Sequence, residues 1–190
     1  AAPVLSSQVN RAVTELTALS VVNTATDADL PANILTYQLL NPPEGASIDS
    51  SGNIHWTPTE QQGPGTFTLT TLVTDNGPGS LTATNSFIVS LSEVNSTPII
   101  RPTGDQSVRK STLLTFTVQA DDSDFPVQTI SYSLDPGTPS GASINPTTGI
   151  FNWTPTSAQS PNTNFVTIRA MDGGAPSMSS AQVIRIVVTD

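Results

Sequence analysis

The sequence contains no cysteine and a single histidine, His55, among its 190 residues. Disulfide bridges, thiolate nucleophiles and cysteine zinc sites are therefore excluded, and so is any site that needs several histidines. Lysine and arginine number 6 against 15 aspartates and glutamates, which gives a net charge of −9. A chain this acidic repels nucleic acid and anionic membranes. No apolar run approaches the ~20 residues of a membrane-spanning helix, so neither nucleic-acid binding nor membrane insertion is expected.

No segment carries apolar residues at helical spacing over three turns. Short runs of Val, Ile, Leu and Phe instead alternate with polar residues, and 12 glycines and 16 prolines fall mostly between them. This pattern is typical of strands joined by turns, so the sequence predicts an all-β fold. The predicted strands in the first half cover 16–24, 35–40, 47–48, 53–56, 66–74 and 83–92. Those in the second half cover 113–120, 130–134, 143–144, 150–153, 165–171 and 182–189.

The chain is a tandem duplication. Asp29-Leu30-Pro31 returns as Asp124-Phe125-Pro126 at an offset of 95, and Trp56-Thr57-Pro58-Thr59 returns as Trp153-Thr154-Pro155-Thr156 at an offset of 97. The drift of the offset indicates one- or two-residue insertions in turns. We expect two domains, 1–95 and 96–190, each with the size of a seven-strand sandwich.

The ends of the chain match the linker between the repeats. Ser96-Thr97-Pro98 corresponds to Ala1-Ala2-Pro3, and Thr189-Asp190 corresponds to Ser92-Glu93. The chain therefore starts just after one linker position and stops just before the next. We expect an excerpt of a longer array or a unit that joins others end to end, with neighbouring repeats of the same or a like chain as partners.

Several motifs recur in both repeats and together carry a family resemblance. They are Ala25-Thr26-Asp27-Ala28-Asp29, Gly45-Ala46-Ser47-Ile48-Asp49 and Gly52-Asn53-Ile54-His55-Trp56-Thr57-Pro58, with Ala120-Asp121-Asp122-Ser123-Asp124, Gly141-Ala142-Ser143-Ile144 and Thr148-Gly149-Ile150-Phe151-Asn152-Trp153-Thr154-Pro155. Over essentially the whole chain, they resemble the bacterial putative-Ig, dystroglycan-type cadherin-like tandem repeat domains. The resemblance implies two tandem immunoglobulin-like (cadherin-like) Greek-key β-sandwiches in an extracellular array, often with calcium at the junctions.

Acidic residues gather at the predicted strand ends. Asp122 and Asp124 are two residues apart, so in an extended loop both side chains lie on the same side and both carboxylates can converge on one ion. Asp172 ends a later strand at the same pole. Ca²⁺ takes 6–8 oxygen ligands, several of them carboxylates, and Glu93 and Asn95 lie in the linker. The competing interpretation is that Asp-x-Asp forms Asx turns without any ion.

The resemblance adds Glu15, because a glutamate near the start of the preceding repeat completes a cadherin site. The predicted Ca²⁺ junction set is Glu15, Glu93, Asn95, Asp122, Asp124 and Asp172. A second half-site, which needs an upstream repeat to complete it, comprises Asp27, Asp29 and Asp75. Lys110 stands at the position of Glu15 in the second repeat, so a downstream junction should bind calcium poorly. No match to the acidic Asp-Arg-Glu-type segment of cadherins follows either Trp-Thr-Pro turn.

The two tryptophans could serve as sugar-stacking platforms or as core residues. Ile54 and Phe151 lie two positions before them on the same strand face, which favours the core. His55 points to the opposite face and has no partner that would make it a base. A glycosidase needs two carboxylates that face each other across a cleft. The acids of this sequence lie instead at the ends of strands, so we expect no enzyme.

These features predict a non-catalytic, extracellular or cell-surface structural or adhesion module, which calcium makes rigid at the junction between its repeats. A cell-surface protein or a polysaccharide is the expected class of further partner. One alternative is a carbohydrate-binding module, which needs an exposed aromatic strip. The other is a subunit of a self-assembling extracellular filament, joined by strand or linker exchange.

Overall fold

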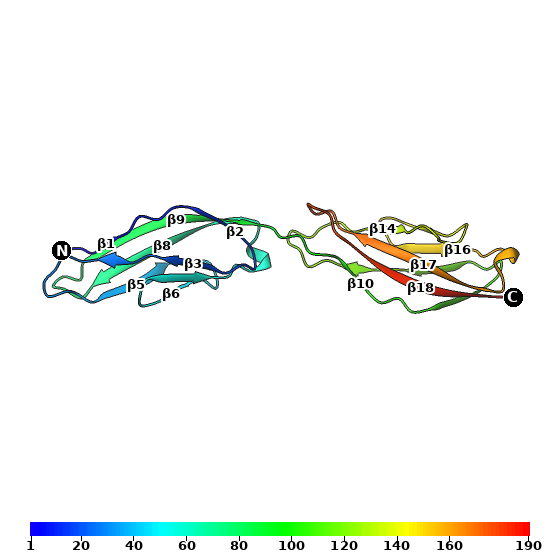
Figure 1. Ribbon diagram of the computed structural model, residues 1–190, viewed down its shortest axis with the longest axis horizontal. Coiled ribbons are helices and arrows are strands. Elements are labelled where there is room, and N and C mark those ends of the chain that lie inside the picture. The colour runs from blue at the N-terminus through cyan, green and yellow to red at the C-terminus, as the bar shows by residue number, and fades with distance from the viewer. The chain divides into compact units, whose positions relative to one another are not determined.

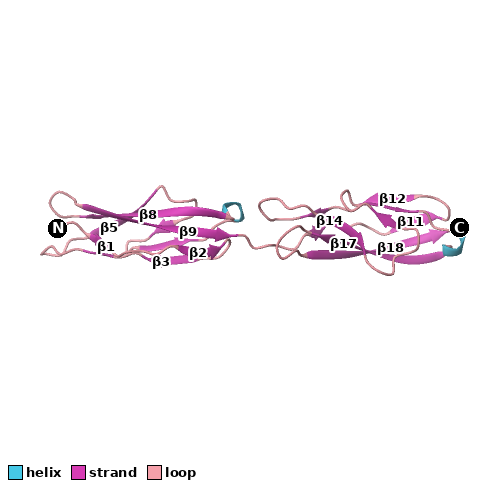
Figure 2. Ribbon diagram, turned by 90° about the horizontal axis from the view of Figure 1, so that it is seen from above, coloured by secondary structure: helices cyan, strands magenta, loops and turns pink.

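The computed structural model describes residues 1–190, which divide into two compact units, Ala1–Val94 and Asn95–Asp190. Both units consist of strands and loops, with one three-residue 3₁₀ turn each (Figures 1 and 2). The predicted all-β fold is therefore confirmed. No helix of the chain has the length and apolar character that crossing a membrane requires.

The first unit is a sandwich of two sheets. Its elements are β1 (Val4–Leu5), β2 (Arg11–Thr14), β3 (Leu19–Val22), β4 (Ala25–Thr26), β5 (Leu35–Leu40), β6 (Ser47–Ile48), β7 (Asn53–Trp56), η1 (Glu60–Gln62), β8 (Gly65–Asp75) and β9 (Thr82–Ser92). One sheet has the order β2-β9-β8-β5 and the other the order β3-β7-β6, while β1 pairs with β4. Only β2 and β9 run parallel; the other pairs are antiparallel.

The second unit repeats this topology. Its elements are β10 (Ile99–Ile100), β11 (Gln106–Arg109), β12 (Leu114–Thr117), β13 (Ala120–Asp121), β14 (Ser131–Leu134), β15 (Ser143–Ile144), β16 (Ile150–Trp153), η2 (Ser157–Gln159), β17 (Asn162–Met171) and β18 (Ser179–Thr189). Its sheets have the orders β11-β18-β17-β14 and β12-β16-β15, and β10 pairs with β13. The two units are thus Greek-key, immunoglobulin-like sandwiches with the same strand order, as predicted.

Several strand boundaries differ from the predicted ones. The predicted strand 16–24 is wrong at its start, because Leu16 lies in a turn with a φ of 57° and β3 begins only at Leu19. The predicted strand 113–120 is likewise shorter, since β12 covers Leu114–Thr117. The sequence did not reveal β2 and β11, because each pairs in parallel with the last strand of its own repeat, far away along the chain.

Both tryptophans are buried in matching places in the two cores, as predicted. Trp56 is 2% exposed and Trp153 is 1% exposed. Their indole N–H groups donate to the carbonyls of Glu44 at 3.1 Å and Ser140 at 3.2 Å. Trp56 also meets Phe67 edge-on, with 5.1 Å between ring centroids. Each tryptophan therefore fills the core and anchors a neighbouring loop.

Trp56→Ala should destabilise the first repeat by about 3–5 kcal/mol, because it empties a large buried volume and leaves the Glu44 carbonyl without its donor. Trp153 is then the only remaining tryptophan, so its fluorescence reports on the second repeat alone. In urea, the circular dichroism transition of the first repeat should move to lower concentration while the Trp153 transition stays in place. Equal shifts of both transitions would contradict this assignment.

Candidate metal sites

Three glutamates meet at the end of the first repeat where β9 leaves the sandwich. Glu15, Glu60 and Glu93 each offer a carboxylate oxygen within 4.8 Å of those of the other two. Glu15 is 1% exposed, and the other two are half-buried. We call this group the glutamate cluster. Three like charges at such spacing repel strongly unless a cation lies among them.

The chain holds Glu15 firmly in this place. Glu15 follows β2, and its N–H donates to the Ser92 carbonyl at 3.1 Å, while the next N–H, of Leu16, donates to the Pro58 carbonyl at 2.9 Å. Oε1 of Glu15 accepts the N–H of Val94 at 2.8 Å. Oε2 of Glu15 is buried and has no hydrogen-bond partner. A buried carboxylate oxygen of this kind is what a hard cation would satisfy.

The opposite pole of the first repeat has a cluster of aspartates. Asp27, Asp29 and Asp75 also bring one oxygen each within 4.8 Å of the others. Most of their oxygens are already occupied: Asp27 Oδ1 accepts the Asp29 N–H at 2.9 Å, and Asp75 Oδ1 accepts the N–H groups of Gly77 and Leu81, both at 3.0 Å. Asp29 Oδ1 contacts the amino terminus. Asp27 Oδ2 is buried and unpartnered.

The matching pole of the second repeat forms a polar network around Asp124. This carboxylate is 2% exposed and accepts the Ser96 N–H, at 2.9 Å to Oδ2, and the Gln128 side-chain amide at 2.9 Å. Gln128 also donates to Asn95 Oδ1 at 2.6 Å, and Asn95 donates to Asp172 Oδ2 at 3.1 Å. The network therefore ties the start of the second repeat, at Asn95 and Ser96, to the loop after β13 and to the end of β17.

Asp122 lies beside this network, and one of its two carboxylate oxygens has no hydrogen-bond partner. Its Oδ1 accepts the Asp124 N–H at 3.0 Å, while its Oδ2 is buried without a partner. Burial, with the nearby charges of Asp124 and Asp172, raises the pKa of the Asp122 carboxyl. Burial also acts to raise the pKa of Asp172, but hydrogen bonds from Met178, Gly174 and Asn95 outweigh it and hold that pKa below its usual value.

The end of the second repeat differs from the glutamate cluster. Lys110 replaces Glu15, Ser157 replaces Glu60 and Asp190 replaces Glu93. Lys110 Nζ lies 3.0 Å from Asp190 Oδ1, and the Ser160 hydroxyl donates to the same oxygen at 3.0 Å. These two hydrogen bonds lower the pKa of Asp190. This pole therefore has one carboxylate and its own positive charge.

The predicted junction residues fall into two groups, each within its own repeat. Glu15 and Glu93 lie in the glutamate cluster; Asn95, Asp122, Asp124 and Asp172 lie in the polar network of the second repeat. The predicted half-site Asp27, Asp29 and Asp75 is a single cluster.

Sequence reasoning missed Glu60 and Gln128. No Asp-Arg-Glu-type segment follows either Trp-Thr-Pro turn, but a single acid does in the first repeat: Glu60 opens η1 there and offers a carboxylate oxygen to the cluster. Its match in the second repeat is Ser157, so a search for shared acids passes over it. Gln128 was overlooked because a neutral amide gives no charge signal.

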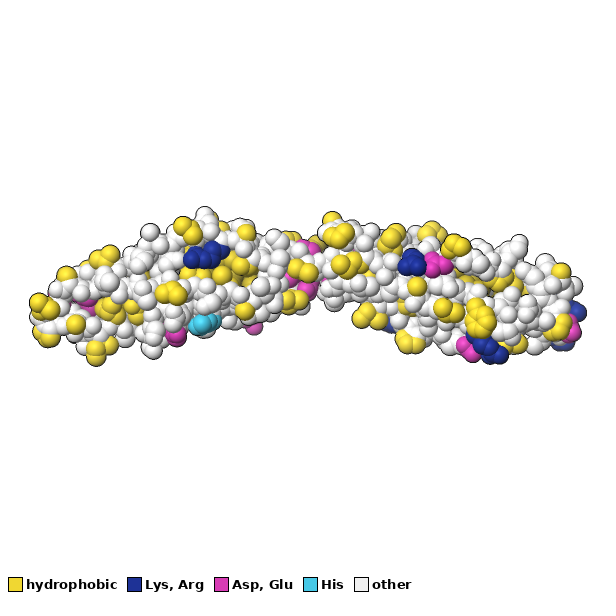
Figure 3. Space-filling model, in the orientation of Figure 1, with side chains coloured by type: hydrophobic (Ala, Val, Ile, Leu, Met, Phe, Trp, Pro, Cys, Tyr) yellow, Lys and Arg dark blue, Asp and Glu magenta, His cyan; other side chains and the backbone are white.

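Other candidate features have ordinary surroundings. His55 is exposed, 4.0 Å from Asp49. Basic residues of the second repeat pair locally, Arg101 with Asp121 and Arg169 with Asp135, and the face seen in Figure 3 shows no continuous basic patch.

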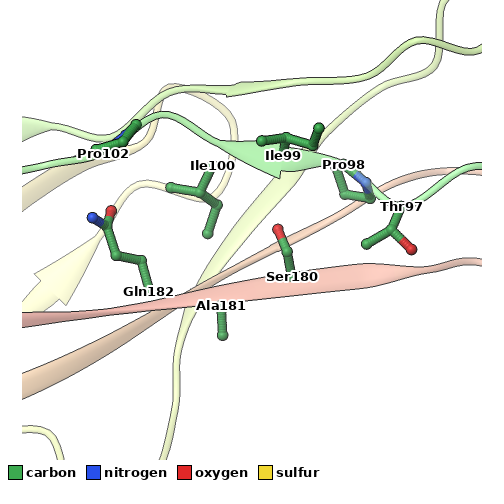
Figure 4. A pocket seen from close by; sticks show the side chains of 8 residues that line it. All are labelled: Thr97, Pro98, Ile99, Ile100, Pro102, Ser180, Ala181 and Gln182. Carbon is green, nitrogen blue, oxygen red and sulfur yellow. The ribbon is translucent and has the colours of Figure 1, made fainter.

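The second repeat also has an open groove of about 540 Å³ between β10 and the start of β18 (Figure 4). Its walls carry Pro98, Ile100 and Pro102 on one side and Ser180 and Gln182 on the other. The lining includes neither an aromatic nor a charged side chain. The groove therefore offers no ring on which a sugar would stack.

Family models cover nearly the whole chain. A model described as a bacterial Ig domain matches residues 1–88, and a model described as a putative Ig domain matches residues 97–189. Among curated proteins, none matches this sequence.

Solved structures of cadherin repeats have a similar fold. Mouse cadherin-23 EC22-24 is 21% identical with a TM-score of 0.63, covering 100% of this chain and 65% of that one. Human CDH23 EC21-23 is 24% identical with a TM-score of 0.61, covering 98% and 63%. Protocadherin Gamma B2 extracellular cadherin domains 1-5 are 20% identical with a TM-score of 0.65, covering 100% and 40%. The chain spans less than two thirds of each of these proteins.

Asp122→Asn should stabilise the second repeat in calcium-free buffer at neutral pH. The amide oxygen still accepts the Asp124 N–H, while one buried negative charge disappears. Calorimetry should show a higher melting temperature, by about 4–8 °C for each kcal/mol of repulsion removed. Because the pKa of Asp122 is raised in the folded state, the charge destabilises the fold above that pKa and ceases to do so once falling pH protonates it.

The advantage of the variant over the wild type should therefore shrink as the pH falls. Asp105→Asn is the matched control, because Asp105 is exposed and pairs with Arg185 at 3.3 Å. It should give no stabilisation. A lower melting temperature for Asp122→Asn at neutral pH without calcium would show that Asp122 carries no repulsion.

Proposed function

Because the first repeat belongs to the bacterial Ig domains and the second to the putative Ig domains, we propose that this chain is a non-catalytic, extracellular structural or adhesion module in which calcium stiffens the junction between the repeats. The cadherin-like fold, the acidic poles and the small number of basic side chains support this proposal. The expected partners are neighbouring repeats of the same or a like chain.

The observation that carries the proposal is the carboxylate of Glu15. It is almost fully buried, has one oxygen without a hydrogen-bond partner, and lies beside the carboxylates of Glu60 and Glu93. An isolated buried charge is strongly unfavourable and persists only with a counter-charge. Glu15, Glu60 and Glu93 would hold Ca²⁺, which supplies positive charge and coordinates oxygen ligands without directional demands.

Chain connectivity links this cluster to the second repeat. Glu93 and Asn95 are two residues apart, so their Cα atoms are separated by at most about 7 Å. Asn95 is hydrogen-bonded into the network that contains Asp124, Asp172 and the free oxygen of Asp122. Cations bound at this link would attract carboxylates of both repeats, whereas without cations the same carboxylates repel and the link acts as a hinge.

Glu15→Gln tests the site with little change in shape. The amide oxygen can still accept the Val94 N–H, but the variant lacks the charge that holds the ion. For a dissociation constant of about 10⁻⁴ M, about 10 mM calcium should stabilise the wild type by about 2.7 kcal/mol. The variant should lose most of this gain and should be at least as stable as the wild type in chelator. Thermal unfolding with and without calcium measures both effects.

Glu44→Gln is the control, since it removes the same charge from an exposed side chain of the same repeat. It should leave the calcium response unchanged. Absence of any calcium-induced heat or stabilisation in the wild type at millimolar concentration would refute the proposed function.

Calcium should also change the distribution of distances in small-angle scattering. When calcium replaces chelator, the maximum intramolecular distance of the wild type should increase and its distance distribution should become narrower. Glu15→Lys should stay hinged, because a unit positive charge about 4 Å from a divalent cation in an effective dielectric of about 20 is repelled by about 8 kcal/mol. Identical responses of the two proteins would mean that Glu15 is not a ligand.

A further inference from the structure

Gly63 stands directly against the glutamate cluster. A Cβ atom at this position would overlap Oε2 of Glu15 and would lie 3.0 Å from the Glu15 Cδ and 3.1 Å from its Cβ. Oε2 is the buried oxygen that has no hydrogen-bond partner. The missing side chain of Gly63 is therefore the space in which the inner half of the Glu15 carboxylate lies.

The backbone does not require glycine here. Gly63 has a φ of −99° and a ψ of 152°, an extended conformation that any residue can adopt. The corresponding residue after η2 is Ser160, with a φ of −126° and a ψ of 147°. The same turn thus accepts a side chain in the second repeat, so the need for glycine in the first must come from its surroundings.

The second repeat shows what happens when that space is filled. Ser160 is accompanied by Lys110 in place of Glu15, and its hydroxyl donates to Asp190, the carboxylate that Lys110 also binds. Serine therefore occurs with the pole that supplies its own cation, and glycine occurs with the three-carboxylate pole. Identical folds with opposite charge arrangements make the two repeats a matched pair.

We propose that Gly63 is a positioning residue for cation binding: the space left by its absent side chain lets the Glu15 carboxylate turn inward toward Glu60 and Glu93. The inference rests on the proposed calcium function and goes beyond it by assigning a role to a residue that contributes no ligand atom. A side chain at position 63 would displace the far end of Glu15, which is flexible, so the fold survives while the three oxygens no longer converge.

Gly63→Ala tests this by calorimetric titration with calcium chloride on the whole chain. The dissociation constant should rise about 10–100-fold, the range seen when a residue that orients a ligand is altered. The melting temperature in chelator should change little, because the carboxylate moves out toward water. Gly104→Ala is the control: no atom lies within 4 Å of the added methyl group, so affinity should stay the same.

A second-site variant separates positioning from general damage. Aspartate at position 15 is one methylene shorter and leaves room for the methyl group at position 63. Glu15→Asp combined with Gly63→Ala should therefore bind calcium more tightly than Gly63→Ala alone. If the double variant is no better, or if Gly63→Ala binds like the wild type, the positioning role is wrong while the calcium site stands. A wild type that gives no binding heat overturns both.

The converse experiment builds the site in the second repeat. Lys110→Glu with Ser157→Glu supplies the missing carboxylates beside Asp190, and adding Ser160→Gly supplies the space. Titration should show that the triple variant binds one more calcium ion than the wild type. The dissociation constant of this new site should be at least about tenfold higher in the double variant than in the triple variant. Equal binding by the double and triple variants would contradict the role of the empty position.

Discussion

A buried carboxylate without a counter-charge is the constraint from which the rest of this molecule follows. Hydrogen bonds from the N–H groups of Glu15 and Leu16 fix the backbone at this position, and the Val94 N–H donates to Oε1 of Glu15, so the carboxylate lies inside the pole next to two others. The second repeat has Lys110 at the corresponding position, and its positive charge pairs with the negative charge of Asp190 within the same repeat. In the proposed function, the first repeat takes its positive charge from a bound ion, which would make the state of its pole dependent on the surrounding solution.

The sandwich permits this difference because its poles are independent of its core. Trp56 and Trp153 occupy matching places and tie matching loops, and the sheets of the two repeats have the same strand order. Exchanging glutamate for lysine, or glycine for serine, at the end of β2 or after the 3₁₀ turn leaves these core contacts untouched. A duplicated domain can therefore keep one fold while its two ends acquire different electrostatics.

Sequence reasoning succeeded where the signal is local or repeated. Alternation gave β5, β6, β7, β15 and β16 with their observed bounds, and the duplicated Trp-Thr-Pro turn located both cores. It failed where partners are distant or unequal: β2 has only four residues and pairs with a strand more than seventy residues later, and Glu60 has no acidic match in the second repeat. The role of Gly63 could not be predicted from the sequence, because it depends on which atom occupies the space beside the glycine, and that atom, Oε2 of Glu15, is known only from the structure.

The choice between lysine and a free ion also has a mechanical meaning within the proposed function. The ammonium of Lys110 is attached to its own repeat, so the charge it supplies is satisfied locally by Asp190 and does not depend on any neighbour. Each glutamate brings one carboxylate oxygen into the cluster, and three oxygens fall short of the 6–8 that calcium takes. In the proposed function, the remaining positions would be open to oxygens beyond the short link, and Asp122 has one buried oxygen without a hydrogen-bond partner. Under this proposal, the pole with the glutamate cluster, which needs a cation from solution, is suited to joining repeats. The pole with Lys110 carries its own positive charge and needs no neighbouring repeat.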